Sequence, residues 1–183
     1  SALCGRSRQI KTSAKGEDRP FTGKKEFDMP LDAITLTHLT RELDARLAGS
    51  RVDKIYMPDK NEAVLLLRAR EGNVRLLLCA SQNGARLQLT TSQRENPKVP
   101  PMLCMLLRKH LVGARLLSIT QEPLERVVRV QFEVVSELGD LEPRQLVLEM
   151  MGRTSNMILL GPQETVLAAL HYIDMSEGKN RQL

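Results

Sequence analysis

Arg126 is the residue whose type and position point most directly to chemistry. It shares the alternation of the apolar residues in the segment 126–135, so it is predicted at the rim of a buried sheet face. A guanidinium stays charged and is costly to bury alone, so it needs a carboxylate such as Asp32 or Glu125, or else a bound phosphate or carboxylate. The spacing leaves both alternatives open.

A second candidate anion site lies between two apolar runs in the segment 149–160. Its small or polar residues are Gly152, Arg153, Thr154, Ser155 and Asn156. Such a turn can direct backbone N–H groups and hydroxyls at an anion, with Arg153 supplying charge. The alternative is a tight hairpin whose polar side chains satisfy their own backbone.

Three basic residues, Arg108, Lys109 and His110, end a helix predicted over 102–111. Bases in a last turn complement the helix dipole more often than they bind RNA, so Arg108 and Lys109 are secondary candidates for RNA contacts. The sequence contains no metal-ligand spacing, P-loop, GxSxG or GxGxxG motif. We therefore predict no metal, no cofactor and no catalytic residues.

Two helices and nine strands are predicted to position these side chains. Leucines at helical spacing predict a helix over 35–48, with Asp32 or Thr35 as N-cap, while Pro101 and Gly113 bracket the helix over 102–111. The pair Asn83-Gly84 indicates a hairpin, because both residues tolerate positive φ. Strands are predicted over 51–57, 63–70, 73–80, 85–91, 116–121, 126–135, 144–151, 156–160 and 165–170. This order predicts an α+β fold of two packed, mainly antiparallel sheets, a β-sandwich, with two principal helices.

Composition places the chain among globular proteins. Its 183 residues are 42% apolar and 27% charged, which suits one domain with a full core. Three scattered cysteines argue against a disulfide framework, and the absence of Trp argues against an aromatic platform for single-stranded nucleic acid. No apolar stretch is long enough for a membrane helix or a secretory signal, so we expect a cytoplasmic protein without a membrane partner.

The formal charge of +5 is concentrated at the start of the chain. Residues 1–28 carry seven basic and four acidic side chains, a net charge of +3. We interpret 1–28 as a leader, of natural or cloning origin, and the alternative is a basic arm that contacts nucleic acid. The domain itself is assigned to 29–183, as a fragment of a longer protein.

Two long motifs, over 96–111 and 149–159, resemble the N-terminal domain of the NFACT family, in one register across 29–183. That family includes the bacterial RqcH proteins, also known as fibronectin-binding protein A, and eukaryotic NEMF. The resemblance implies a non-enzymatic, tRNA-binding and rRNA-binding factor in ribosome-associated quality control. Such factors bind the large ribosomal subunit carrying a stalled peptidyl-tRNA and direct alanine tailing of the nascent chain. It also implies a fold similar to the N-terminal domain of formamidopyrimidine-DNA glycosylases.

The resemblance also assigns site residues. Asp32 matches an Asp near the start of the family domain, and Arg126 matches the Arg of an Asp-Arg pair, with Glu125 standing where the family usually has Asp. We therefore predict that Asp32, Glu125, Arg126 and Arg153 bind tRNA. Ser155 and Asn156 join Arg108 and Lys109 as further candidates for RNA contact.

Two other function classes compete with this hypothesis. A DNA glycosylase is suggested by Met29-Pro30, but Leu31 stands where those enzymes have their catalytic Glu. A surface adhesin that binds fibronectin or fibrinogen is suggested by the older family name, although no export signal or disulfide framework supports it.

Overall fold

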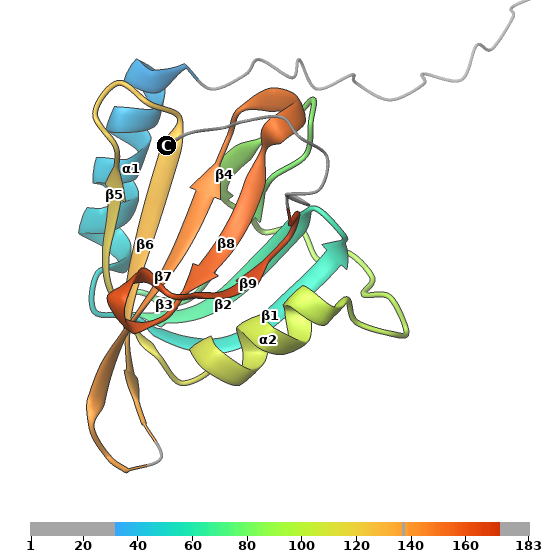
Figure 1. Cartoon of the computed structure of the whole chain (residues 1–183). Helices are drawn as coiled ribbons and strands as arrows, with labels where there is room; N and C mark the ends of the chain where they lie inside the picture. Colours follow the sequence, from blue (N-terminus) through green and yellow to red (C-terminus); the bar gives the residue numbers. More distant parts are fainter. Residues whose placement is uncertain (1–31, 137, 173–183) are drawn as a thin grey trace, which may run out of the picture.

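The computed structural model describes residues 32–136 and 138–172. Within these ranges, nine antiparallel strands form one sheet in the order β4-β3-β2-β1-β5-β6-β7-β8-β9, and two helices pack against it (Figure 1). The helices are α1 (Ala33–Leu47) and α2 (Met102–Leu111). The strands are β1 (Arg51–Asp59), β2 (Glu62–Ala69), β3 (Gly72–Cys79), β4 (Arg86–Leu89), β5 (Arg115–Gln121), β6 (Val127–Val135), β7 (Leu141–Glu149), β8 (Asn156–Leu160) and β9 (Val166–Ala169). Short 3-10 turns lie at Gly152–Thr154 and Pro162–Glu164.

The expectation of two separate sheets is wrong, whereas the α+β class and both helices are confirmed. The sheet has two halves, β1–β4 and β5–β9. The strands β1 and β5 join these halves through the single residue pair Arg51 and Arg115. Flanking backbone bonds extend the junction, from Val52 N to Ala114 O and from Leu116 N to Ser50 O. In Figure 1 β1–β3 run across the view while β6–β8 run upright, so the sheet changes direction at this junction. The similarity to the glycosylase domain stays a prediction.

A single main core joins both halves of the sheet to both helices. Leu65 and Leu76 from the first half and Phe132 and Leu146 from the second are fully buried in it. Helix α1 packs mainly on β5, and α2 packs on β1, β6 and β9. The two halves of the sheet therefore share one continuous hydrophobic core, which the sequence predicts between two separate sheets.

Helix α1 begins where the sequence places its cap. Asp32 Oδ1 accepts a hydrogen bond of 2.6 Å from Thr35 N, which confirms Asp32 rather than Thr35 as the N-cap. Leu36, Leu43 and other residues at helical spacing are buried. Near the C-terminal end of the helix, Asp44 Oδ1 accepts a hydrogen bond of 2.7 Å from Ile119 N, which fixes the helix along β5.

Helix α2 has the bounds that its flanking residues predict. Pro101 occupies the N-cap position, and Gly113 lies beyond the last turn at φ +86°, a conformation that favours glycine. Leu103, Cys104 and Leu107 face the core. Burial raises the pKa of the Cys104 thiol, in keeping with a packing role.

The hairpin between β3 and β4 differs from the expected tight turn. Cys79 pairs with Arg86, so residues 80–85 form a six-residue connection. Asn83 and Gly84 both lie within it without positive φ. Arg86 donates to Gly84 O at 3.1 Å, which stabilises this longer loop in place of a two-residue turn.

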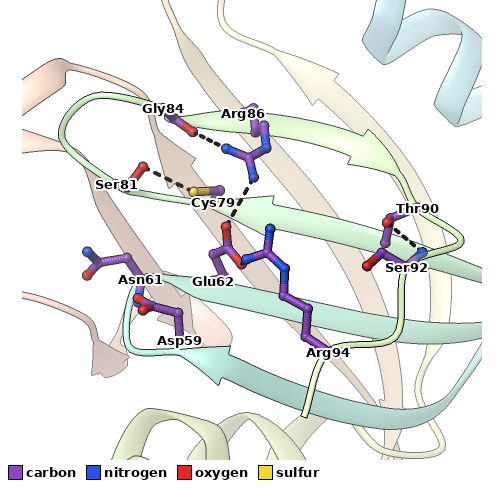
Figure 2. A network of polar contacts seen from close by, with 10 residues as sticks. All are labelled: Asp59, Asn61, Glu62, Cys79, Ser81, Gly84, Arg86, Thr90, Ser92 and Arg94. Carbon is purple, nitrogen blue, oxygen red and sulfur yellow. Dashed lines mark hydrogen bonds and ion pairs between the residues drawn. The ribbon is translucent and has the colours of Figure 1, made fainter. Parts of the chain in front are cut away.

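A buried carboxylate, Glu62, ties the segment after β4 to the sheet. Figure 2 shows Glu62 between two arginines, with Oε1 at 3.1 Å from Arg86 and Oε2 at 2.7 Å from Arg94. The Glu62 side chain is 10% exposed, whereas that of Arg94 is 57% exposed. Arg94 belongs to residues 90–101, which lead to α2, so this network sets the path of that segment.

Candidate functional site

The side chain of Gln121, at the end of β5, brings the first turn of α1 next to the β5–β6 turn. Its Nε2 donates to Ala33 O at 2.9 Å and to Glu125 O at 2.7 Å. Its Oε1 accepts from the Thr37 hydroxyl at 2.7 Å. Ala33 follows Asp32 and Glu125 precedes Arg126, so the backbones of three predicted residues lie in one region, where β5 ends and β6 begins. We call this region, with Asp32, Glu125 and Arg126, the corner site.

The β5–β6 turn itself is closely held. Glu125 N donates to Glu122 O at 3.1 Å, and the Glu122 carboxylate pairs with the Arg129 guanidinium on β6. Leu124, at the third position of the turn, has φ +61° and is 89% exposed. A leucine in the left-handed region is strained, and such strain is concentrated at functional sites.

Arg126 lies just before β6 rather than within it. Its carbonyl accepts from Met150 N at 2.9 Å, but the strand ladder begins at Val127. The alternation of the strand is confirmed, because Val128, Val130 and Phe132 are buried in the main core, whereas Val127 faces the other way into a satellite cluster with Val147 and Leu160. Arg126 is therefore half-buried at the start of the strand.

The expected ion pair of Arg126 with Asp32 or Glu125 is not formed. Within 32–136 and 138–172, the Arg126 guanidinium has neither an ion-pair nor a hydrogen-bond partner. Asp32 uses one carboxylate oxygen to cap α1, and this hydrogen bond from Thr35 lowers the pKa of the Asp32 carboxyl. Glu125 is exposed. Of the two alternatives for Arg126, the structural ion pair thus loses its support.

The β7–β8 turn starts beside the corner site, because Met150 pairs with Arg126. Arg153 is exposed on the turn at Gly152–Thr154. The Thr154 hydroxyl donates to Met151 O at 3.2 Å, so this side chain satisfies its own turn. Ser155 is 2% exposed, and its buried Oγ has no partner among the described residues. Arg153 is accordingly the member of this turn that is placed to reach a ligand.

Asn156 has a structural task at the end of β8. Its Nδ2 donates to His171 O at 3.0 Å, while its Oδ1 accepts from His171 N at 3.0 Å and from Met157 N at 2.9 Å. The two bonds with His171 hold the chain beyond β9 against β8, whereas the bond with Met157 lies within β8. Together these bonds leave little of the Asn156 amide for RNA, and its RNA contact stays a prediction.

Arg108 and Lys109 lie away from the corner site, on α2. Arg108 Nε donates to Ile55 O at 2.8 Å, which fixes its guanidinium against β1. Lys109 is exposed. Figure 1 places α2 below the sheet, whereas the β5–β6 and β7–β8 turns lie at the upper edge. The structure therefore separates the predicted RNA contacts into two regions.

Sequence inspection missed Gln121 and Leu124 as members of the corner. Gln121 is unremarkable in a strand pattern, and only the return of α1 past the end of β5 makes its amide a bridge. The signal available for Leu124 was its place after Pro123 in a short turn before a strand. That signal concerns backbone conformation and gives no indication of function.

Comparison with known families gives one match over most of the chain. The family model described as NFACT N-terminal and middle domains matches residues 32–183. The chain is 38% identical over 139 residues to the Rqc2 homolog RqcH of Bacillus subtilis, covering 76% of this chain and 24% of that protein. It is 29% identical over 139 residues to the human ribosome quality control complex subunit NEMF, covering 76% of this chain and 12% of NEMF. The chain thus spans about a quarter or less of these relatives.

Solved structures resemble the fold closely. The N-terminal domain of fibronectin-binding protein PavA from Streptococcus pneumoniae superposes with a TM-score of 0.78 at 35% identity, over 83% of this chain and 58% of that one. The N-terminal part of the fibronectin/fibrinogen-binding protein of Streptococcus suis gives 0.79 at 36% identity, over 82% and 57%. Neither helix in the described part of the chain is long and apolar enough to cross a membrane.

Proposed function

Since this chain belongs to the NFACT family, we propose that it is the tRNA-handling N-terminal part of a ribosome-associated quality control factor. Two relatives support this assignment through their names, which are Rqc2 homolog and ribosome quality control complex subunit. The whole protein would bind the large ribosomal subunit with its peptidyl-tRNA and direct alanine tailing of the stalled chain. It would work in the cytoplasm as a binding factor, not as an enzyme.

One observation carries the assignment of the tRNA contact to the corner site. Gln121 links Ala33 and Glu125, and so holds the exposed carboxylates of Asp32 and Glu125 in the same region as Arg126. An arginine without an intramolecular acceptor suits a phosphate or a guanine edge, and carboxylates accept hydrogen bonds from base amino groups. A site that combines an arginine with two carboxylates favours specific contacts with individual groups of the tRNA over general attraction to a polyanion.

Arg153 extends the proposed contact onto the neighbouring turn. It is exposed and follows Gly152, which has φ +61°, so the turn presents its side chain to solvent. A second cation beside Arg126 would bind an adjacent phosphate of the same tRNA. Glu125, one methylene longer than the family Asp, would reach farther from the turn and shift the position of the base that it contacts.

Binding of a fluorescently labelled tRNA to the 183-residue chain, followed by anisotropy, tests this proposal. Arg126→Gln is expected to weaken binding about tenfold or more, as for loss of a specific guanidinium contact. The matched control is Arg70→Gln, which removes the same charge from an exposed residue in the β2–β3 turn. Equal binding by wild type and Arg126→Gln, with unchanged circular dichroism, would exclude the corner site.

A second candidate function is adhesion to fibronectin or fibrinogen. The names of the similar solved domains from Streptococcus pneumoniae and Streptococcus suis support it. Immobilised fibronectin would retain the chain under this alternative, and Arg126→Gln would leave the retention unchanged. The glycosylase alternative depends on Met29-Pro30, which lie outside the described residues.

A further inference from the structure

The β6–β7 hairpin projects from the sheet as a free two-stranded ribbon. Strand β5 pairs with β6 only as far as Glu133, and β8 pairs with β7 only from Gln145 onward. Two further residue pairs and the turn after Val135 thus extend beyond both neighbouring strands, by roughly 10 Å at the rise of a β-strand. Figure 1 shows this ribbon below the body of the molecule, on the same side as α2. It lies at the opposite end of β6 from the corner site.

The tip of this hairpin is apolar and exposed. Val135 and Leu141, a directly opposed pair, are 69% and 64% exposed, and Leu138 in the turn is 91% exposed. Opposed residues of an antiparallel pair point to the same face, so Val135 and Leu141 form one apolar surface. A two-stranded ribbon is at best marginally stable alone in water, and a large exposed apolar patch marks an interaction site. The tip is therefore expected to contact a partner.

The hairpin is also acidic. Residues 133–142 contain four acidic and no basic side chains. Glu142 is neutralised by Arg144, whose guanidinium lies 2.6 Å from the Glu142 Oε2 atom. Asp140 is exposed, and no base in the described ranges lies within ion-pair distance of it. The surface that covers the tip should therefore combine apolar and basic side chains.

A groove of this complementary character lies between the base of the hairpin and the C-terminal end of α2. Its volume is about 630 Å³. Val112 and Ala114 contribute apolar lining, Lys109 contributes a cation, and Glu142, which also lines the groove, is already paired. Lys109 is exposed and has no ion-pair partner in the described part of the chain. Met105, Lys109 and Val112 follow one another at helical spacing on the exposed side of the helix, so apolar side chains flank this cation.

The hairpin cannot fill its own groove with its apolar pair. The register sets Val135 and Leu141 on one face of the ribbon, whereas Glu142 and Arg144 lie on the other face, which lines the groove. A second copy of the chain removes this obstacle, because its α2 can approach the outer face of the ribbon. One end of the molecule then carries both a hairpin and the complement of a hairpin, as a two-fold symmetric interface requires.

We propose that two copies of this chain form a symmetric dimer in which each hairpin docks on α2 of the other copy. Val135 and Leu141 of one copy pack against the apolar side chains on the exposed side of that helix. Asp140 lies opposite Lys109 of the second copy, so two charges that have no ion-pair partner among the described residues of one chain neutralise each other. This interface does not involve the corner site, and it is independent of the proposed function.

The exposed area fits a dimer of moderate strength. Five apolar side chains of the interface are 49% to 91% exposed and together present roughly 300 Å², namely Met105, Val112, Val135, Leu138 and Leu141. A stable interface buries ~800 Å² on each partner, of which a little more than half is apolar. Most of the required apolar area is therefore available, and we expect a dissociation constant in the micromolar range.

Sedimentation equilibrium of the 183-residue chain, from low micromolar to submillimolar concentration, tests the proposal. The wild type is expected to shift from monomer to dimer over this range. Leu138→Ser with Leu141→Ser should weaken association at least about tenfold, because the tip loses its apolar surface. The matched control is Ile34→Ser with Val166→Ser, at side chains that are 70% and 55% exposed outside the hairpin and the groove. The control should change association less than about twofold, and circular dichroism checks that both variants fold.

Charge reversal tests which two surfaces meet. Asp140→Lys and Lys109→Asp should each weaken the dimer at least about fivefold, because like charges then face each other across the interface. The double variant Asp140→Lys with Lys109→Asp exchanges the two charges and should restore the association of the wild type. Such a rescue depends on contact between the hairpin and α2, which a change in net charge alone would not reproduce.

Three results would overturn the proposal. A wild-type chain that stays monomeric over the whole range would assign the apolar tip to a partner of another kind. A dimer that the hairpin variant leaves unchanged, or a double variant no better than the single ones, would place the interface elsewhere. Association that continues beyond two copies would indicate an open head-to-tail contact in place of the two-fold exchange.

Discussion

Gln121 Nε2 lies 2.7 Å from the carbonyl oxygen of Glu125, four residues farther along the chain. The same nitrogen lies 2.9 Å from Ala33 O, so one amide group holds a turn and a helix end together. Its oxygen is occupied by Thr37. The position of Glu125 and Arg126 relative to α1 is therefore set by a side chain that need not contact any ligand.

Replacing Gln121 by Ala should loosen the corner while leaving the core intact. Loss of the bridge is expected to lower the free energy of unfolding by about 1 kcal/mol, the usual net value of such hydrogen bonds. tRNA affinity should fall as well, because Arg126 loses its fixed position. Urea unfolding and tRNA anisotropy measure the two effects. Gln88→Ala, at an exposed glutamine of β4, is the control, and an equal response of both variants would contradict a positioning role.

The N-cap of α1 should show a defined pH dependence. The pKa of Asp32 is lowered by its hydrogen bonds from Thr35, so the charged form stabilises the folded state. That contribution is present above the unfolded pKa near 3.8 and is lost as the pH falls through the lower folded value. Asp32→Ala should reduce the melting temperature by a few degrees at pH 7 and by less at pH 3. A gap of the same size at both pH values would contradict this cause.

The two helices could be predicted well because their signals are local. Pro101 and Gly113 bracket α2, and Asp32 caps α1 through a residue only three positions away. The single sheet could not be predicted, because the pair Arg51 and Arg115 joins segments that are far apart in sequence and carries no apolar pattern of its own. Nothing in the local pattern separates one continuous sheet from two sheets.

The residues of the candidate site could be named from the sequence, but the contacts that bring them together could not, because these contacts join segments that are far apart in the chain. The resemblance to a family assigned Asp32, Glu125 and Arg126, and their common location follows from the return of α1 along β5. Of the two alternatives for Arg126, the ion pair with Asp32 is not formed, and the Asp32 carboxylate caps its own helix. The role of Gln121 depends on a bridge over 88 residues of sequence, which no spacing rule describes.

The backbone of Leu124 should be strained, and the strain should be relieved by a residue that tolerates positive φ. Its φ of +61° is costly for leucine but is tolerated by asparagine, and its side chain is 89% exposed. Leu124→Asn is therefore expected to raise the free energy of unfolding by about 0.5 to 1 kcal/mol in urea titrations. Leu124→Ala lacks the side-chain amide whose local hydrogen bonds make positive φ tolerable for asparagine, so it should gain little. An equal gain in both variants would attribute the effect to the lost apolar side chain.

The buried carboxylate of Glu62 should be important for stability at the edge of the sheet. It is 10% exposed and contacts two guanidinium groups, so its neutralisation leaves the partly buried Arg86 without its carboxylate partner, although Arg86 keeps its hydrogen bond to Gly84 O. Glu62→Gln is expected to lower the free energy of unfolding by about 2 kcal/mol, below the range for fully buried pairs because Arg94 is largely exposed. Chemical denaturation measures the change, and a loss below about 0.5 kcal/mol would contradict the importance of this network.

The Arg94 contact should matter for local order more than for global stability. Arg94 is exposed, so Arg94→Ala should change the free energy of unfolding by less than about 1 kcal/mol. It nevertheless holds residues 90–101 to Glu62, while Arg75 holds the same segment through Thr91 O and Gln93 Oε1 (Figure 2 shows the Glu62 side).

A lysine-specific protease should cleave after Lys98 several-fold faster in Arg94→Ala than in the wild type, because local opening exposes that bond. Arg70→Ala, outside the network, should leave the rate unchanged. Glu62→Gln should likewise increase the rate of cleavage after Lys98. A cleavage rate equal to that of the wild type would contradict this role of Glu62 and attribute the position of the segment to Arg75.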